Sequence, residues 1–357
     1  MTWTVKTQLP VEFEIRKTEN VLSFAEIPSG RKVIVIDQTV YDLYRDALPT
    51  DAQTVILPIE ASEATKDWKN AHRILSFLET NGVLRRSEPV IAIGGGVLLD
   101  MVGFACSVYR RGVPYIRIPT TLLGIVDASV GAKTSINHFG RRNRIGSFFT
   151  PTLTLIDKSF IKTQDSREIS NGIAEILKLA IVLDRTLFEL VEVNPELLIK
   201  QKFQNNPLAD QIIDRAISGM TKELNDNLWE KELQRAVDYG HTFSPIVEMK
   251  NVPELLHGEA VILDCLLSAC ISVNRGLLSN SELIRIFNLL KKVNLPTQHI
   301  DFYDVDLLYS GLKDVMIHRN NNQYLPIPTA IGKCIIINDL NFREIELAVD
   351  KLKELNE

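Results

Sequence analysis

Two histidines and one glutamate occur in settings that suit a metal ion. His241 follows a glycine in Gly-His-Thr-Phe, His257 precedes one in Leu-His-Gly-Glu, and Glu175 lies on an earlier helical segment, three residues before Lys178. Two imidazoles and one carboxylate suit Zn²⁺ and leave one position open for substrate. The same residues also fit two structural histidines beside a helix start. The histidines are too far apart to form a local ligand pair, so spacing leaves both interpretations open.

A glycine turn precedes these residues in the chain. The apolar run 89–93 leads into Gly94-Gly95-Gly96, and a helical pattern follows. Such a turn lets the backbone approach a pyrophosphate, and the helix N-terminus favours the anion. Leu99 stands where the third glycine of the dinucleotide fingerprint belongs, so a tight turn without a ligand fits equally well. Asp37 ends an earlier apolar strand, where an acid can bind a ribose.

The segment 119–146 combines hydroxyls, glycines and cations. Its charged residues include Asp127, Lys133 and the run Arg141–Arg144. The pattern predicts a loop. Point charges and hydrogen-bond donors of this kind build a phosphate or sugar site. The arginine run alone fits a solvated basic loop, but with Asp127 and Lys133 beside it the segment favours a site.

Apolar periodicity divides the chain into two domains, 1–158 and 159–357. Short apolar runs alternate with helical patterns in the first, which predicts βαβ units and a mostly parallel sheet. The second is mainly helical. The predicted strands are 32–36, 54–58, 89–93, 115–118 and 152–156, with a half-buried strand or hairpin over 3–17; the predicted helices are 67–81, 97–109, 173–191, 210–223, 256–274, 281–293 and 342–355.

Composition excludes several classes of protein. The 357 residues suit about two domains, and 45% hydrophobic and 24% charged residues are ordinary for a globular chain. A net charge of −5 gives no reason to expect nucleic-acid binding. Four scattered cysteines indicate reduced thiols and a cytoplasmic location. No signal peptide is expected, and the apolar run 260–273 is too short for a membrane span, which predicts a buried core helix.

Eight motifs follow one another along the chain. They are GGGVLLD at 94–100, YRRG at 109–112, PTTLL at 119–123, VDASVGAKT at 126–134, NRIG at 143–146, GIAEILK at 172–178, GHTF at 240–243 and LHGEAV at 256–261. In this order the motifs resemble the dehydroquinate-synthase-like sugar phosphate cyclases, and the resemblance extends from about Lys32 to about Ile331.

The resemblance implies an α/β N-terminal NAD-binding domain, a mainly α-helical C-terminal metal-binding domain, and a homodimer. It implies that Glu175, His241 and His257 bind Zn²⁺, with Co²⁺ as the alternative metal. It assigns NAD contacts to Asp37, Glu63, Lys66, Gly95, Gly96, Asp100, Thr120, Thr121 and Arg142. It assigns the substrate to Lys133, Lys178, Asp127, Asn143, Asp238, Arg111 and His318, with Arg111 reaching a neighbouring subunit's site. Without the resemblance, Lys66 also fits a surface lysine and Asp100 a plain helix-turn acid.

The departures from dehydroquinate synthases point to one branch of the family. Those enzymes carry Asn and His where this chain has Asp238 and Pro245, and a basic residue where it has Gln234. A site without these cations should not favour a carboxylated substrate, because the anion would be poorly paired. DYGHTFSP at 238–245, RRNR at 141–144 and HR at 318–319 resemble the sedoheptulose 7-phosphate cyclases.

Within that branch, the residue types at three positions are similar to those of 2-epi-5-epi-valiolone synthases: Leu224, Asp238 and His318. The resemblance then implies transient oxidation by NAD, β-elimination of phosphate, re-reduction and an intramolecular aldol reaction, with no membrane or nucleic-acid partner. The alternatives are the sister cyclases that make 2-epi-valiolone or desmethyl-4-deoxygadusol, 3-dehydroquinate synthase, an NAD- and metal-dependent polyol dehydrogenase, and a non-catalytic binding protein on the same fold.

Overall fold

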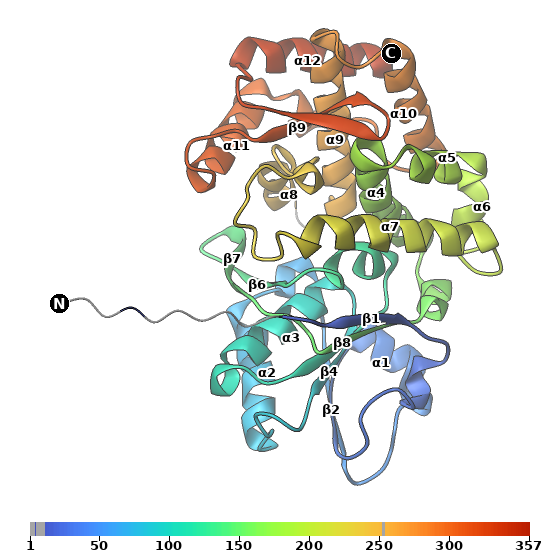
Figure 1. Ribbon diagram of the computed structural model, residues 1–357, viewed down its shortest axis with the longest axis vertical. Helices are drawn as coiled ribbons and strands as arrows, with labels where there is room; N and C mark the ends of the chain where they lie inside the picture. Colours follow the sequence, from blue (N-terminus) through green and yellow to red (C-terminus); the bar gives the residue numbers. More distant parts are fainter. Residues whose placement is uncertain (1–3, 5–10, 252–253) are drawn as a thin grey trace.

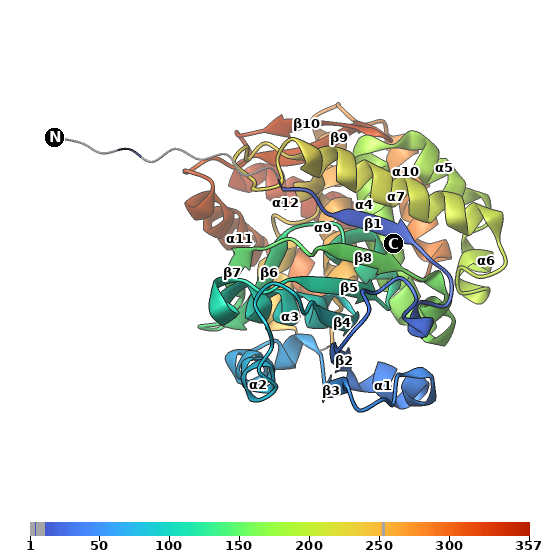
Figure 2. The same cartoon turned by 60° about the horizontal axis from the view of Figure 1, so that its bottom comes forward.

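Six parallel strands form the main sheet in the first half of the chain. The computed structural model describes Thr4 and residues 11–251 and 254–357. The strand order is β1-β8-β5-β4-β2-β3, which Figure 2 shows from top to bottom. Their bounds are β1 (Glu14–Lys17), β2 (Lys32–Asp37), β3 (Thr54–Ile59), β4 (Val90–Gly94), β5 (Tyr115–Pro119) and β8 (Leu153–Ile156). The five strands predicted from short apolar runs, β2, β3, β4, β5 and β8, are confirmed to within one residue at each end.

The edge strand β1 is shorter than the alternation over 3–17 predicts. Only Glu14–Lys17 form a strand, and it pairs in parallel with β8. Val11 and Phe13 precede it outside any regular element, and Val11 is exposed. Residues 1–3 and 5–10 lie outside the described part of the chain.

Helices cover both faces of this sheet. Side chains of β2 alternate between the two faces because successive Cβ atoms of a strand point to opposite sides. Val33 and Val35 pack in one core with residues of α2 (Trp68–Thr80) and α3 (Gly96–Val108). Ile34 and Ile36 pack in another core, against α1 (Gln38–Tyr44), which the sequence pattern did not predict. The α/β class predicted for this half is confirmed.

The second half is built around α9 (His257–Asn274). Every residue from Gly258 to Ser272 is buried, and α9 packs against α4, α8, α10 and α12. Within the described residues α9 is the one helix long and apolar enough to cross a bilayer, but 83% of it is buried inside the protein. The core-helix prediction for 260–273 is confirmed.

The other helices surround α9, as the upper part of Figure 1 shows. They are α4 (Ser166–Leu183), α5 (Arg185–Val193), α6 (Pro195–Lys200), α7 (Pro207–Asn225), α8 (Ser244–Lys250), α10 (Asn280–Lys292), α11 (Val305–His318) and α12 (Phe342–Asn356), with the hairpin β9 (Leu325–Ala330) and β10 (Lys333–Ile337). The prediction of one helix over 173–191 is wrong, because Asp184 leaves helical geometry and its side chain caps α5 at Leu187 N. The sequence pattern did not predict α6, α8, α11 or this hairpin.

The segment predicted as a loop is in part a β-hairpin. Strands β6 (Lys133–His138) and β7 (Arg141–Phe148) pair antiparallel, so the loop prediction is wrong for these residues. The hairpin packs on α3 of the first half and also contacts α8 of the second. Figure 1 shows it at the level where the two halves meet. Its side chains can therefore reach groups from both halves.

Candidate active site

One large cavity, of about 1180 Å³, lies between the sheet and the helical half. It opens at the carboxyl ends of β2, β4 and β5, where the strand order reverses and ligands of open α/β sheets bind. The predicted site residues that line it are Asp37, Glu63, Lys66, Gly95, Gly96, Asp100, Thr120, Thr121, Asp127, Lys133, Arg142, Asn143, Lys178, Asp238, His241 and His257. Their individual roles stay predictions.

The glycine turn lines the end of the cavity where the sequence predicts that a dinucleotide binds. Strand β4 ends at Gly94, and Gly95 is the N-cap of α3. A Cβ on Gly95 would lie 3.2 Å from Thr121 Cγ2, and one on Gly96 would lie 3.1 Å from Ala128 Cβ. A side chain at either position would therefore require its neighbour to shift by a few tenths of an ångström, and the N-terminus of α3 lines the cavity. This arrangement fits a pyrophosphate.

Asp37 lies beside this turn, at the end of β2. Its Oδ1 accepts hydrogen bonds from Thr39 N at 2.9 Å and Val40 N at 3.3 Å, which caps α1. Burial raises the pKa of Asp37 above its usual range, against these hydrogen bonds. The predicted ribose-binding acid therefore also begins a helix.

Lys66 is a buried residue, not a surface lysine. Its Nζ lies 2.6 Å from Asp100 Oδ2 and donates to Asn143 Oδ1 at 2.6 Å. Ser135 Oγ donates to the same Asn143 oxygen at 2.9 Å. The network joins the segment just before α2, helix α3 and the hairpin, so Asn143 is held by protein groups on the cavity wall.

Arg142 joins the dinucleotide end of the cavity to the histidines. Its Nε donates to Glu63 Oε1 at 2.9 Å, and its Nη1 forms an ion pair with Glu248 and lies 3.0 Å from His257 Nδ1. Although burial acts to raise it, Arg142 and Lys66 lower the pKa of Glu63 to about 2. Glu63 is therefore ionised at neutral pH.

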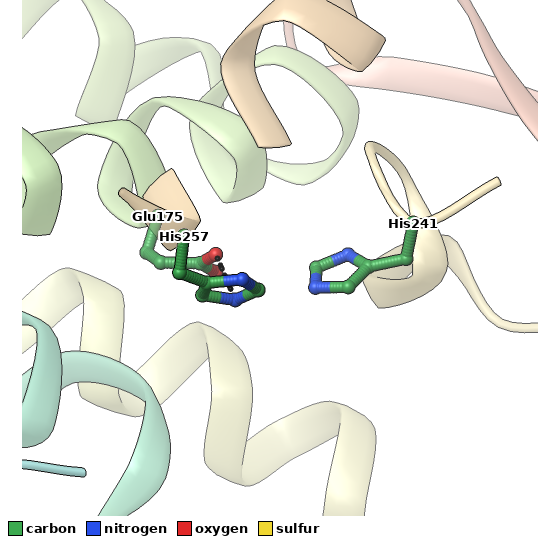
Figure 3. A group of neighbouring side chains, drawn as sticks. All are labelled: Glu175, His241 and His257. Carbon is green, nitrogen blue, oxygen red and sulfur yellow. Dashed lines mark ion pairs between the residues drawn. The ribbon is translucent and has the colours of Figure 1, made fainter. Parts of the chain in front are cut away.

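Glu175, His241 and His257 converge on one point. Each offers a ligand atom, and these atoms all lie within 4.8 Å of one another. Figure 3 shows Glu175 and His257 side by side, with His241 directed at them from the opposite side. His257 Nε2 lies 3.5 Å from Glu175 Oε1. Spacing in the sequence left open whether the two histidines belong to one site. In the structure, three chain segments bring them together with Glu175, and the three side chains form the donor set of a zinc site.

The surroundings of the two histidines leave Nε2 free to bind a metal. His257 Nδ1 lies 3.0 Å from Glu248 Oε2, and His241 Nδ1 lies 3.2 Å from the carbonyl oxygen of Tyr239. A carboxylate or carbonyl at Nδ1 fixes the ring and directs the other nitrogen to a metal. Glu248 lies on α8 outside any local motif, so the sequence pattern gave no sign of its role.

The surroundings of Glu175 also suit a metal ligand. Within the described residues neither of its buried oxygens accepts a hydrogen bond of good geometry, although Lys178 Nζ forms an ion pair with Oε2 at 2.6 Å. Against the effect of burial, Lys178 and the histidines lower the pKa of Glu175 to about 2. Burial, followed by Lys178, lowers the pKa of His241 to about 3. The carboxylate is thus ionised and His241 neutral at pH 7, as metal ligation requires.

Asp127 is a second carboxylate that interacts with the Lys178 ammonium. It belongs to a π-helical turn, Gly124–Ala128. Burial and the neighbouring Glu175 raise its pKa, whereas Lys178 lowers it less. Two carboxylates around one buried ammonium therefore have pKa values pushed in opposite directions, a pattern typical of sites that divide acid and base roles.

Charged side chains gather at the end of the cavity away from the glycine turn. Asp238 bonds to Arg319 Nη2 at 3.1 Å and forms an ion pair with Arg235, and Lys133 Nζ lies 2.5 Å from Glu230 Oε1. Although burial acts to raise it, Arg235 and Arg319 hold the pKa of Asp238 below its usual range. This end of the cavity therefore carries three cations against two carboxylates, Asp238 and Glu230, and the net positive charge suits an anionic substrate group.

Two predicted substrate residues do not line this cavity. His318 is exposed, with its Nε2 3.3 Å from Arg144 Nη1, and the next residue, Arg319, lines the cavity instead. Arg111 is exposed at the turn after α3. The structure therefore does not place either residue on the wall of this cavity, and the substrate role of His318 stays a prediction. The proposed reach of Arg111 into a neighbouring subunit stays a prediction.

Gly258→Ala should displace His257 and destabilise the protein. A Cβ at position 258 would lie 2.2 Å from the backbone oxygen of Asn171. Overpacking of this kind costs about 1–3 kcal/mol, and it would move the first turn of α9 away from α4. We expect a lower free energy of unfolding in urea and weaker zinc retention. Gly219→Ala on α7, where no atom lies within 4 Å of the new Cβ, is the control and should be neutral or stabilising. An unaffected Gly258→Ala variant would contradict the packing argument.

Comparisons with known proteins agree with this geometry. The 3-dehydroquinate synthase N-terminal family model matches residues 56–171 and the 3-dehydroquinate synthase C-terminal model matches residues 172–316. A 2-epi-5-epi-valiolone synthase of an Actinomyces species is 40% identical, over 99% of this chain and 98% of its own length. The chain belongs to the dehydroquinate-synthase-like family of sugar phosphate cyclases.

Two further relatives of this cyclase place it within the family. The solved structure of ValA, a 2-epi-5-epi-valiolone synthase from Streptomyces hygroscopicus with NAD⁺ and Zn²⁺ bound, superposes with a TM-score of 0.96 at 42% identity, over 99% of both chains. A demethyl-4-deoxygadusol synthase from Trichormus variabilis is 34% identical, over 91% of this chain and 82% of its own length. The predicted two-domain fold and the resemblance to sugar phosphate cyclases are confirmed.

Proposed function

We propose that this cyclase converts sedoheptulose 7-phosphate into 2-epi-5-epi-valiolone and phosphate, with NAD and Zn²⁺ as cofactors. The observation that carries the proposal is the near full-length match to ValA, 42% identical, together with the convergence of Glu175 with His241 and His257, two histidines that line the same cavity as the glycine turn. The enzyme is then a carbon–oxygen lyase that acts on a phosphate.

Different residues along the cavity have different roles in this reaction. When bound, NAD and Zn²⁺ supply a reversible hydride transfer and polarisation of a substrate oxygen, with no net redox change. Lys178 holds a positive charge beside the metal ligands, and Asp127 and Asp238 accept hydrogen bonds from sugar hydroxyls. Lys133 belongs to the phosphate end, where its positive charge favours the anion. Phosphate leaves by β-elimination, and an aldol reaction closes the carbocycle.

Arginine contacts explain the preference for a substrate without a carboxylate. Arg235 and Arg319 both pair with Asp238, so a substrate group placed next to Asp238 meets a carboxylate whose cations are already engaged. A substrate carboxylate placed there would meet a like charge, whereas a hydroxyl would donate to it. This geometry favours a neutral sugar end over the precursor of 3-dehydroquinate.

The remaining expectations belong to the same proposal. We propose that the protein acts in the cytoplasm as a homodimer, with Arg111 directed to the partner's phosphate site. A sister cyclase making 2-epi-valiolone or desmethyl-4-deoxygadusol is the second candidate, favoured by the 34% identity to the Trichormus enzyme. A polyol dehydrogenase is disfavoured, because a small polyol needs no phosphate-binding cations.

Purified enzyme with NAD⁺ and Zn²⁺ should release phosphate from sedoheptulose 7-phosphate without accumulating NADH. Parallel reactions contain 3-deoxy-arabino-heptulosonate 7-phosphate, and phosphate is measured against enzyme stripped of metal. NMR of the product identifies the stereoisomer. Release from the second substrate alone would make the chain an unusual dehydroquinate synthase, and steady accumulation of NADH would make it a dehydrogenase.

A further inference from the structure

A fully buried aspartate on α9 bonds to the loop that carries His241. Asp264 Oδ2 accepts hydrogen bonds from three consecutive backbone amides, Thr242 N at 2.8 Å, Phe243 N at 2.6 Å and Ser244 N at 2.8 Å. Its Oδ1 accepts from Ser268 Oγ at 3.3 Å. Asp264 has no exposed surface, and it does not line the cavity.

These amides belong to the residues directly after the ligand His241. They lead into α8, whose first amides have no partner within the helix. The carboxylate satisfies them from a different helix, and a charged acceptor makes such bonds stronger than a neutral one. The loop is therefore attached to α9 through one side chain.

Close packing holds the same loop from the other side. Gly240 has φ +78°, and a Cβ there would lie 2.6 Å from Cys265 Sγ and 2.9 Å from the backbone oxygen of Val261. Tyr239 Oη donates to the backbone oxygen of Cys265 at 2.6 Å. All these contacts come from the segment 261–265 of α9, so the loop before and after His241 is fixed to one helix.

We propose that Asp264 is the positioning residue of the metal centre. Helix α9 supplies one ligand directly, His257 at its first position, and sets the place of the second, His241, through Asp264. The separation of the two imidazoles is then determined by a single buried helix. The inference rests on the proposed metal site and goes beyond it by naming the group that fixes the site's geometry.

Asp264→Asn should weaken zinc binding about 10- to 100-fold, the effect typical of losing an outer partner of a metal ligand. Asparagine keeps the shape of the side chain but removes the charge that holds the three amides. Zinc affinity is measured by competition with a chelator, and the visible spectrum of the Co²⁺-loaded protein reports ligand geometry. We expect the cobalt bands to change in position or intensity.

Asp157→Asn is the matched control. Asp157 is a buried aspartate that accepts from two backbone amides, Val21 N at 3.0 Å and Ser159 N at 2.9 Å, and it does not line the cavity. Its variant should lose thermal stability but keep the wild-type cobalt spectrum and zinc affinity. If Asp264→Asn behaves in the same way as this control, Asp264 has only a structural role and the proposal is overturned.

Ser268→Ala keeps the test decisive if Asp264→Asn does not fold. This variant removes only the hydroxyl that bonds to Asp264 Oδ1 and leaves the carboxylate in place. A two- to fivefold loss of zinc affinity with an altered cobalt spectrum supports the proposal, and unchanged values reject it. A wild-type protein that binds neither metal would instead overturn the proposed function.

Discussion

His257→Ala should lose its metal on dialysis and release phosphate at least about 10³-fold more slowly than the wild type. A metal that polarises a substrate oxygen contributes several kcal/mol to the transition state, and each 1.36 kcal/mol is about tenfold in rate. His257 is the first residue of α9, and its side chain is partly exposed to the cavity. Its removal therefore leaves the core packing intact. Metal content and phosphate release are measured on the same preparation.

His72→Ala is the control for His257→Ala. His72 is an exposed residue of α2 whose ring contacts Ser76 Oγ at 3.4 Å. We expect wild-type metal content, activity and melting temperature from this variant. If His257→Ala retained one metal per subunit and full activity, the assignment of the three ligands would be wrong.

Lys178→Met should destabilise the metal-free protein by about 3–5 kcal/mol, because it leaves buried charges without a partner. The ammonium lies 2.6 Å from Glu175 Oε2 and also offsets the negative charge of Asp127. Methionine fills a similar volume but has no charge. Saturating Zn²⁺ should recover part of the loss, since a divalent cation at the same carboxylate replaces the missing charge. Urea denaturation with and without zinc measures both effects.

Lys222→Met separates the loss of a buried charge from the loss of a lysine. Lys222 is exposed on α7, in the same half of the chain, and its variant should change stability by less than about 0.5 kcal/mol with or without zinc. A Lys178→Met variant as stable as the wild type without metal would show that Glu175 is neutral in the folded protein. That result would conflict with its lowered pKa.

Sequence patterns predicted the sheet well and the hairpin badly, for one physical reason. The inner strands are short apolar runs because both faces of a parallel sheet are covered. Strand β7, by contrast, begins with four polar residues, RRNR, of which three are charged, and its partial burial depends on contacts with α3 and α8. Local composition therefore resembles a solvated loop.

Similar limits apply within the site. The metal ligands were identified as candidates from residue type, but only the packing of α4 against α9 brings Glu175 to His257. Glu248 acts through a contact between α8 and α9 that no motif records. Successive residues at a helix end point in different directions, so the sequence could not show that Arg319 faces the cavity and His318 does not.

The origin of the site residues has an evolutionary consequence. The proposed metal ligands and Lys178 project from the buried helices α4 and α9 or from the loop fixed to α9. The cavity residues at the proposed substrate end, Leu224, Arg235 and Asp238, come from the end of α7 and the connection that follows it. Mutations in that connection can alter which sugar phosphate fits while the metal centre and the core stay unchanged. A fold arranged in this way can give rise to cyclases with new substrates by few and tolerated steps.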